Sequence, residues 1–185
     1  MLSVLSAEQS LLLYTIGHST RAAGEFVALL EAHGVRELVD VRTIPRSRHN
    51  PQFNSDALEA TLAAAGLGYV HMPSLGGLRR PKPDSVNAGW RNESFRGYAD
   101  YMQTPAFAAA IDQLIGIARA RPTAIMCAEA VPWRCHRSLI ADALLVRGME
   151  AAEIVSATRT APHALTSFAR PDGTAITYPP EGFAF

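Results

Sequence analysis

The sequence of 185 residues has only two cysteines and no apolar run long enough to cross a membrane. Two cysteines cannot supply a framework of several disulfides, and this scarcity is typical of a reducing compartment. A membrane-spanning helix needs about 20 consecutive apolar residues. Residues 1–10 lack the basic segment of a signal peptide, and Glu8 interrupts them. The sequence therefore predicts a cytoplasmic protein that makes no membrane contact.

The chain also lacks net charge, because 17 lysines and arginines balance 17 aspartates and glutamates. This balance disfavours bulk nucleic-acid binding through a uniformly basic surface, while leaving room for a local basic patch. Apolar residues make up 48% of the chain and charged residues 18%, which is typical of a folded globular protein. With no internal repeat or low-complexity tract, residues 1–185 are expected to form one α/β domain.

Apolar, partly β-branched runs alternate along the chain with segments of helical periodicity. Strands are expected over residues 11–16, 37–41, 68–72, 124–127 and 153–156, and helices over 25–33, 55–65, 104–120 and 135–147. Such alternation predicts a three-layer α/β/α fold with a mainly parallel sheet, of Rossmann-like or rhodanese-like topology. The last thirty residues are less regular, and we expect a short helix near His163 and an extended segment at 175–178.

The segment from Pro73 to Arg96 is long, rich in glycine, proline and arginine, and only weakly periodic. Structureless connections of this length are uncommon in compact domains unless they have a function. We expect this segment to fold over the carboxyl edge of the sheet as a lid.

Both cysteines lie in residues 124–137, a stretch whose pattern predicts a strand, a loop and the start of a helix. In open α/β sheets, ligands bind at the carboxyl ends of the strands. The polar residues that follow the other predicted strands should therefore meet this stretch at one edge. The residues expected to bind ligand there are Ser19, Arg42, Arg46, His49, Arg79, Cys135 and Arg137, and those expected to be catalytic are His18, Cys127, Glu129 and His136.

These residue types predict a reactive site for an anionic molecule, phosphate-bearing or nucleotide-like. Arginine captures phosphate or carboxylate with two parallel hydrogen bonds, and helix N-termini favour anions. A cysteine near arginine, histidine or a helix N-terminus has a lowered pKa, so Cys127 is the candidate nucleophile of a hydrolase or transferase. His18, His136 and Glu129 are candidate acids and bases. This hypothesis requires no metal and no cofactor, and it leaves the oligomeric state open.

Two other functions fit the same residues. In a nucleic-acid-binding or DNA-repair-associated module, the loops 42–48 and 79–96 would contact phosphates while Trp90, Phe95 or Tyr98 stack on bases. In a metal-binding domain, the two cysteines would bind the ion together with a histidine.

The cysteines also have explanations without any function. Cysteine is often buried in a core, and in this interpretation Cys127 is a packed residue at a strand end. In the same interpretation, Cys135 and His136 serve only to cap the helix that follows them.

Several short motifs occur together along most of the chain. They are Tyr14-Thr-Ile-Gly-His-Ser-Thr20, Leu38-Val-Asp-Val-Arg42, Leu75-Gly-Gly77, Phe95-Arg-Gly-Tyr98, Cys127-Ala-Glu129 and Cys135-His-Arg137. In this combination, from about Tyr14 to Tyr178, the chain resembles a large family of bacteria and archaea, the domain-of-unknown-function family 488. The resemblance implies that the polar residues at the strand ends are signature positions of that family. It does not select a reaction.

Overall fold

The structure is a computed structural model that describes residues 11–180. Residues 1–10, in which the sequence shows no basic signal segment, lie outside the described residues, as do residues 181–185. Within residues 11–180, no helix is both long enough and apolar enough to cross a membrane.

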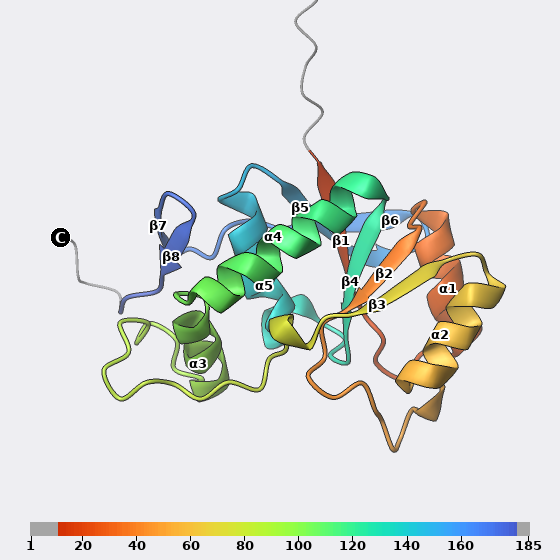
Figure 1. The fold of residues 1–185 in the computed structure, drawn as a ribbon, viewed down its shortest axis with the longest axis horizontal. Coiled ribbons are helices and arrows are strands. Elements are labelled where there is room, and N and C mark those ends of the chain that lie inside the picture. Colours follow the sequence, from red (N-terminus) through yellow and green to blue (C-terminus); the bar gives the residue numbers. More distant parts are fainter. Residues whose placement is uncertain (1–10, 181–185) are drawn as a thin grey trace, which may run out of the picture.

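Six strands form one sheet in the order β3-β2-β4-β1-β5-β6 (Figure 1). They are β1 (Leu12–Gly17), β2 (Glu37–Asp40), β3 (Gly68–His71), β4 (Thr123–Cys127), β5 (Glu150–Ser156) and β6 (Arg159–Pro162). The first five run parallel, and β6 pairs antiparallel with β5. The order resembles the Rossmann order 3-2-1-4-5 with β1 and β4 exchanged, so that β4 lies between β2 and β1. The predicted mainly parallel sheet is confirmed.

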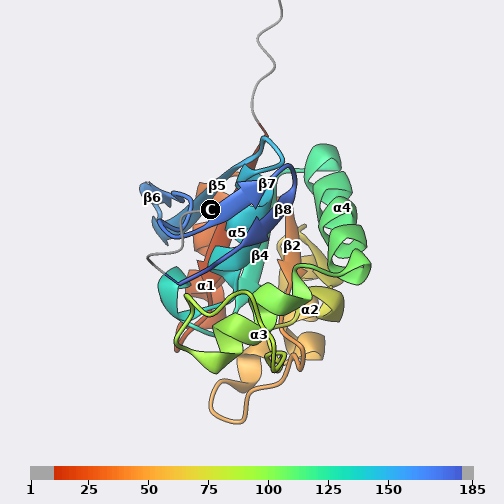
Figure 2. The ribbon, with the colours of Figure 1, turned by 90° about the vertical axis from the view of Figure 1, so that its left-hand side faces the viewer.

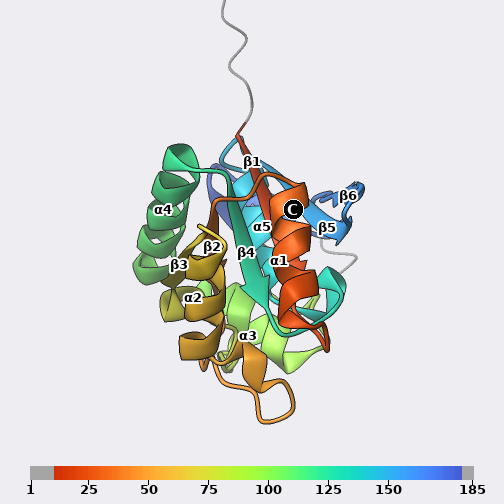
Figure 3. The same ribbon diagram turned by 90° about the vertical axis from the view of Figure 1, so that its right-hand side faces the viewer.

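Helices cover both faces of the sheet, as the two side views show (Figures 2 and 3). They are α1 (Ala23–Ala32), α2 (Ser55–Ala64), α3 (Glu93–Tyr101), α4 (Pro105–Ala120) and α5 (Arg137–Leu145). On one face, α1 and α2 bury Phe26 and Leu58 in one core cluster. On the other face, α4 and α5 bury Ile111 and Leu139 in a second cluster. The three-layer α/β/α fold is therefore confirmed.

Part of the segment between Pro73 and Arg96 is ordered by one buried carboxylate. Asp100 accepts hydrogen bonds from the backbone N–H of Lys82 (2.7 Å), the hydroxyl of Ser85 (2.6 Å) and the amide of Asn87 (2.7 Å). These bonds anchor the loop to α3, whose first turn is capped by the side chain of Asn92. We expected this whole segment to lack regular structure. That prediction is wrong at the end of the segment, because α3 begins there.

The carboxyl-terminal part is held to α5 by Asp142, a second buried carboxylate. Its oxygens lie 2.8 Å from Nε2 of His163 and accept from the backbone N–H of Thr166 (3.1 Å) and the hydroxyl of Tyr178 (2.9 Å). The short helix expected near His163 is wrong, because these bonds hold residues 163–166 as an irregular segment after β6. The expected extended segment is confirmed as β8 (Ala175–Thr177), which pairs with β7 (Arg170–Asp172).

After the neighbouring strands β1 and β4, the chain continues on opposite faces of the sheet. The chain leaves β1 toward α1 on one face and leaves β4 toward α5 on the other. Such a divergence opens a crevice at the carboxyl ends of the two strands, which is where open α/β sheets bind their ligands.

Candidate functional site

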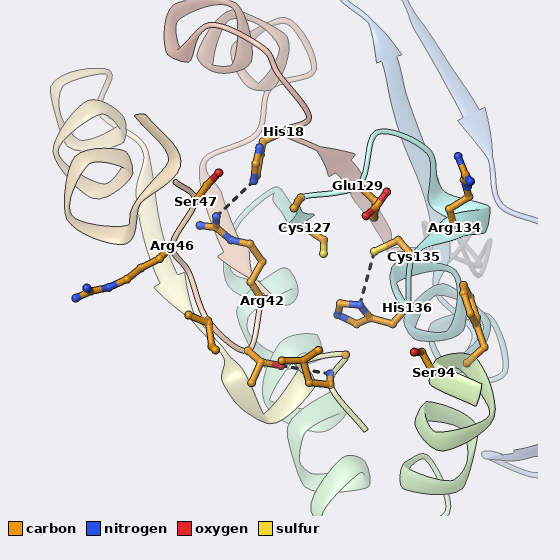
Figure 4. Close-up of a pocket in the computed structure, with 16 residues that line it drawn as sticks. His18, Arg42, Arg46, Ser47, Ser94, Cys127, Glu129, Arg134, Cys135 and His136 are labelled. Atoms are coloured by element: carbon orange, nitrogen blue, oxygen red, sulfur yellow. Dashed lines mark hydrogen bonds between the residues drawn. The ribbon is translucent and has the colours of Figure 1, made fainter. Parts of the chain in front are cut away.

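A cavity of about 410 Å³ opens at the carboxyl ends of β1, β2 and β4 (Figure 4). This volume lies within the range of sites for small molecules. The residues that line the cavity are His18, Arg42, Thr43, Ile44, Arg46, Ser47, Gly77, Leu78, Ser94, Phe95, Cys127, Ala128, Glu129, Arg134, Cys135 and His136. Four of them, Gly77, Leu78, Ser94 and Phe95, come from the segment expected to act as a lid, so this segment forms part of the cavity wall.

Seven of the eleven residues predicted for the site line this cavity. They are His18, Arg42, Arg46, Cys127, Glu129, Cys135 and His136. Ser19, His49, Arg79 and Arg137 are not among the lining residues. The guanidinium of Arg79 instead lies 3.7 Å above the ring of Tyr101 and donates to the carbonyl of Gly76.

The two cysteines and one histidine form a compact cluster on one side of the cavity. The Sγ atoms of Cys127 and Cys135 and a ring nitrogen of His136 all lie within 4.8 Å of one another. Cys127 ends β4, whereas Cys135 lies two residues before the start of α5, after a loop that we call the cysteine loop (residues 128–134). Both thiols are free and buried, with 8% and 3% of each residue exposed.

The two thiols differ in acidity because they interact with each other at close range. The neighbouring Cys127 thiol, together with His136 and Arg137, holds the pKa of Cys135 well below its ordinary value. The interaction with Cys135, reinforced by burial, raises the pKa of Cys127. Of the two, Cys135 is therefore the thiol that ionises first.

His136 is oriented to exchange a proton with Cys135. Its Nε2 lies 3.1 Å from the carbonyl oxygen of Val41, which requires a proton on that nitrogen. Its Nδ1 lies 3.6 Å from Sγ of Cys135 and either accepts the thiol proton or, once protonated, donates to the thiolate. The backbone of Gly77 packs against the same ring, where a methyl group would lie 2.5 Å from Nδ1.

Arg42 is fixed on the opposite side of the cavity by Asp40. Its Nε and Nη2 donate to the Asp40 carboxylate at 2.9 and 2.6 Å, and Nη2 also donates to the carbonyl of Phe53 (2.8 Å). The hydroxyl of Tyr69 donates to the same carboxylate at 2.8 Å. These bonds leave Nη1 directed toward His18, 3.4 Å away.

His18 is held as a neutral ring. Its Nδ1 donates to the carbonyl of Ser19 (2.8 Å), so Nε2 carries a lone pair that accepts from Arg42. Burial, with the nearby charge of Arg42, lowers the pKa of His18, and the ring stacks on Phe53 with centroids 4.2 Å apart. At neutral pH this histidine is therefore a hydrogen-bond acceptor at Nε2.

Residues 22–144, well over half of the chain, match the family model described as Domain of unknown function DUF488. The chain belongs to the DUF488 family. Searches of the curated proteins and of the solved structures found no significant match. Within this DUF488 protein, Cys127, Glu129 and His136 lie inside the matched segment, and His18 lies just before it.

Arg137 has a different place in the DUF488 fold from the one expected. It is fully buried, with Nη1 3.3 Å from both carboxylate oxygens of Glu153 and Nη2 2.7 Å from the carbonyl oxygen of Glu129. It lines a second cavity, of about 430 Å³, together with Glu153 and Trp133. Arg137 thus supports the cysteine loop through its bond to the Glu129 carbonyl. Because it does not line the first cavity, its charge acts there only at longer range.

Sequence reasoning missed Arg134, an exposed residue that also lines the first cavity. Arg134 could have been predicted to lie at the site, because it comes one residue before Cys135 within residues 124–137. With Arg42 and Arg46, it is one of three arginines that line the cavity.

Proposed function

We propose that this DUF488 protein is an enzyme that binds a small anionic molecule, phosphate-bearing or nucleotide-like, and acts on it with the sulfur of Cys135. The observation that carries the proposal is that Cys135, with His136 at its side, lines the same cavity as three arginines. A nucleophile and anion-binding groups are thus close enough to meet one small substrate.

The arginines supply the binding energy. Because Asp40 already holds Arg42 in place, ligand binding costs little further side-chain entropy there. Arg46 and Arg134 are exposed at the cavity wall and can pair with an anion that enters from solvent.

The cysteine cluster supplies the chemistry. The sequence favoured Cys127 as the nucleophile, but we assign this role to Cys135, because Nδ1 of His136 lies 3.6 Å from its sulfur and its pKa is the lowered one. Nδ1 of His136 receives the thiol proton, whereas Nε2 of His18 is engaged with Arg42 and helps to orient that guanidinium toward the cavity. The exposed carboxylate of Glu129 is a further acid or base at the cavity mouth.

The nucleic-acid alternative is less well supported. Tyr98 is fully buried and its hydroxyl donates to the carbonyl of Leu75 at 2.9 Å, so its ring cannot stack on a base. Trp90 packs against Phe95 and Phe168, with ring centroids 4.9 Å apart in each pair.

Two neighbouring arginines give a matched test of anion binding. Arg46 lines the cavity and Arg48 does not, although both are exposed in the same loop. Arg46→Met should weaken binding of ADP, measured by isothermal titration calorimetry, by about tenfold or more, as expected for the loss of a charged hydrogen bond. Arg48→Met should change it less than about twofold, since an exposed charge outside the site contributes little. Equal losses in the two variants would show that general surface charge, and not this cavity, attracts the anion.

A metal centre is the second candidate. The three donor atoms of Cys127, Cys135 and His136 lie close together, and the other ring nitrogen of His136 bonds a carbonyl, as in many metal-binding histidines. Two cysteines, one histidine and an open fourth position would suit zinc.

Elemental analysis of protein purified without chelator separates the two candidates. The thiol-enzyme proposal predicts far less than one zinc per chain and alkylation of Cys135 that is unchanged by chelators. One zinc per chain, lost in His136→Gln, would favour the metal centre.

A further inference from the structure

We propose that Cys127 and Cys135 act together as a dithiol that reduces a small anionic disulfide bound in the cavity. The inference rests on the proposed function, since it uses the same cavity and the same attacking sulfur, and it adds the reaction and the substrate class. It also assigns a role to Cys127. A simple hydrolase or transferase mechanism that uses Cys135 alone would give Cys127 no role.

The first supporting observation is the placement of the two thiols. They are the only cysteines of the chain, eight positions apart in the sequence, and yet their sulfurs lie within 4.8 Å of each other. Both residues line the cavity, and their side chains lie near each other there (Figure 4). A thiol at this distance can attack any adduct formed on its neighbour, because thiol–disulfide exchange proceeds through just such a mixed disulfide.

The second observation is that the two cysteines are held differently. Cys127 belongs to β4, which pairs with strands on both sides, and its carbonyl accepts from the backbone N–H of His18 at 2.9 Å. Cys135 follows the cysteine loop, in which residues 128–130 and Trp133 are exposed. A disulfide requires the sulfurs to approach to about 2.05 Å. Because Arg137 and Ser19 anchor the loop at Glu129 and Ala128, the adjustment that brings the sulfurs together is expected at the Cys135 end of the loop.

The reaction balances without any further oxidant. The Cys135 thiolate attacks one sulfur of a substrate R–S–S–R′, forms a Cys135–S–S–R bond and releases R′–S⁻. The Cys127 sulfur then attacks the Cys135 sulfur, forms the Cys127–Cys135 disulfide and releases R–S⁻. The thiol proton of Cys127 passes to this leaving thiolate, and the proton held on His136 passes to the first one. The substrate gains two electrons, and the two cysteines lose them.

The cavity wall indicates the charge of the substrate. Arg42, Arg46 and Arg134 line a cavity of about 410 Å³, which suits an organic anion with carboxylate or phosphate groups. Hydrogen peroxide, a small neutral oxidant, would make no use of these arginines.

Oxidised glutathione, an anionic disulfide, is the probe for this reaction. The reduced wild-type protein should release two equivalents of glutathione per chain and lose both thiols, with a Cys127–Cys135 link found by peptide mass spectrometry. Cys127→Ser should stop at a mixed disulfide between glutathione and Cys135. Cys135→Ser should release no glutathione, and Arg46→Met should slow the first step about tenfold relative to Arg48→Met.

Three outcomes would overturn the inference. They are a stable mixed disulfide in the wild type, an equally fast reaction with the neutral disulfide of 2-mercaptoethanol, and no reaction of either cysteine with oxidised glutathione. In the last case, iodoacetamide labelling shows whether the proposed function is also wrong. If Cys135 is still alkylated rapidly, only the disulfide reduction is contradicted. If Cys135 is not alkylated, the disulfide reduction and the proposed function are both contradicted.

Cys127→Ala, with circular dichroism to confirm folding, provides a second variant if the serine substitution disturbs the core.

Discussion

Replacing Arg137 by methionine is expected to lower the free energy of unfolding by about 3–5 kcal/mol, because it leaves a buried carboxylate without its partner. Arg137 is fully buried and is the cation that pairs with Glu153, itself only 8% exposed. The substitution also removes the hydrogen bond to the carbonyl of Glu129 and so releases the cysteine loop. Urea unfolding followed by circular dichroism measures the loss.

The pH dependence of this loss identifies its cause. Burial raises the pKa of Glu153, and Arg137 opposes that rise. In Arg137→Met the folded-state pKa of Glu153 should rise further, so the folded protein holds a proton that the unfolded chain gives up above about pH 4.3. The stability of the variant relative to wild type should therefore fall from pH 5 to pH 8. The double substitution with Glu153→Leu should recover most of the loss, whereas an equal loss at both pH values in the single variant would contradict the ion-pair explanation.

Replacing Gly17 by alanine is expected to destabilise the protein by about 3 kcal/mol, the upper end for overpacking, and to disorganise the site. A methyl group on Gly17 would overlap the carbonyl oxygen of Glu129 and lie 2.8 Å from its carbonyl carbon. Both atoms belong to the backbone of the cysteine loop, so the clash cannot be relieved by a change of rotamer. The loop must move, and the contact between Cys135 and Cys127 should be lost with it.

Two other glycines provide matched controls for Gly17. Alanine at Gly24 or Gly116 would meet no atom within 4 Å. Both positions lie in helices, α1 and α4, where alanine is favoured over glycine by roughly 0.5–1 kcal/mol. These variants should be at least as stable as wild type and should keep rapid alkylation of Cys135. Normal alkylation in Gly17→Ala would show that the loop does not depend on its close contact with β1.

The sequence predicted the position of the cavity better than it predicted which side chains line it. The pattern of strand, loop and helix around the cysteines located the cavity, because parallel strands bring their carboxyl ends to one edge. The role of Arg137 was not predictable, since its partner Glu153 comes from β5 and the pairing depends on strand order. Alternation of strands and helices does not determine that order, so the position of β4 between β2 and β1 was not foreseen.

The different surroundings of the two cysteines could not be predicted from the sequence either. Both stand next to loop residues in the sequence, and only the packing shows that Cys135 contacts His136 while Cys127 ends a central strand. The helix α3, in contrast, was missed although a signal was present. Asn92 followed by Glu93 is a common helix start, and the Asn92 side chain does accept from the backbone N–H of Ser94 and Phe95.

The most direct test of the central claim is the pH dependence of iodoacetamide labelling, followed separately at Cys127 and Cys135 by peptide mass spectrometry. The account predicts that Cys135 labels rapidly with an apparent pKa well below the value of about 8.5 for a free thiol, because Cys127 and His136 stabilise its thiolate. Cys127 should remain slow until the protein unfolds, because its interaction with Cys135 and its burial raise its pKa. Faster labelling of Cys127, or two thiols that stay inert in the folded protein, would contradict the claim that Cys135 is the reactive group.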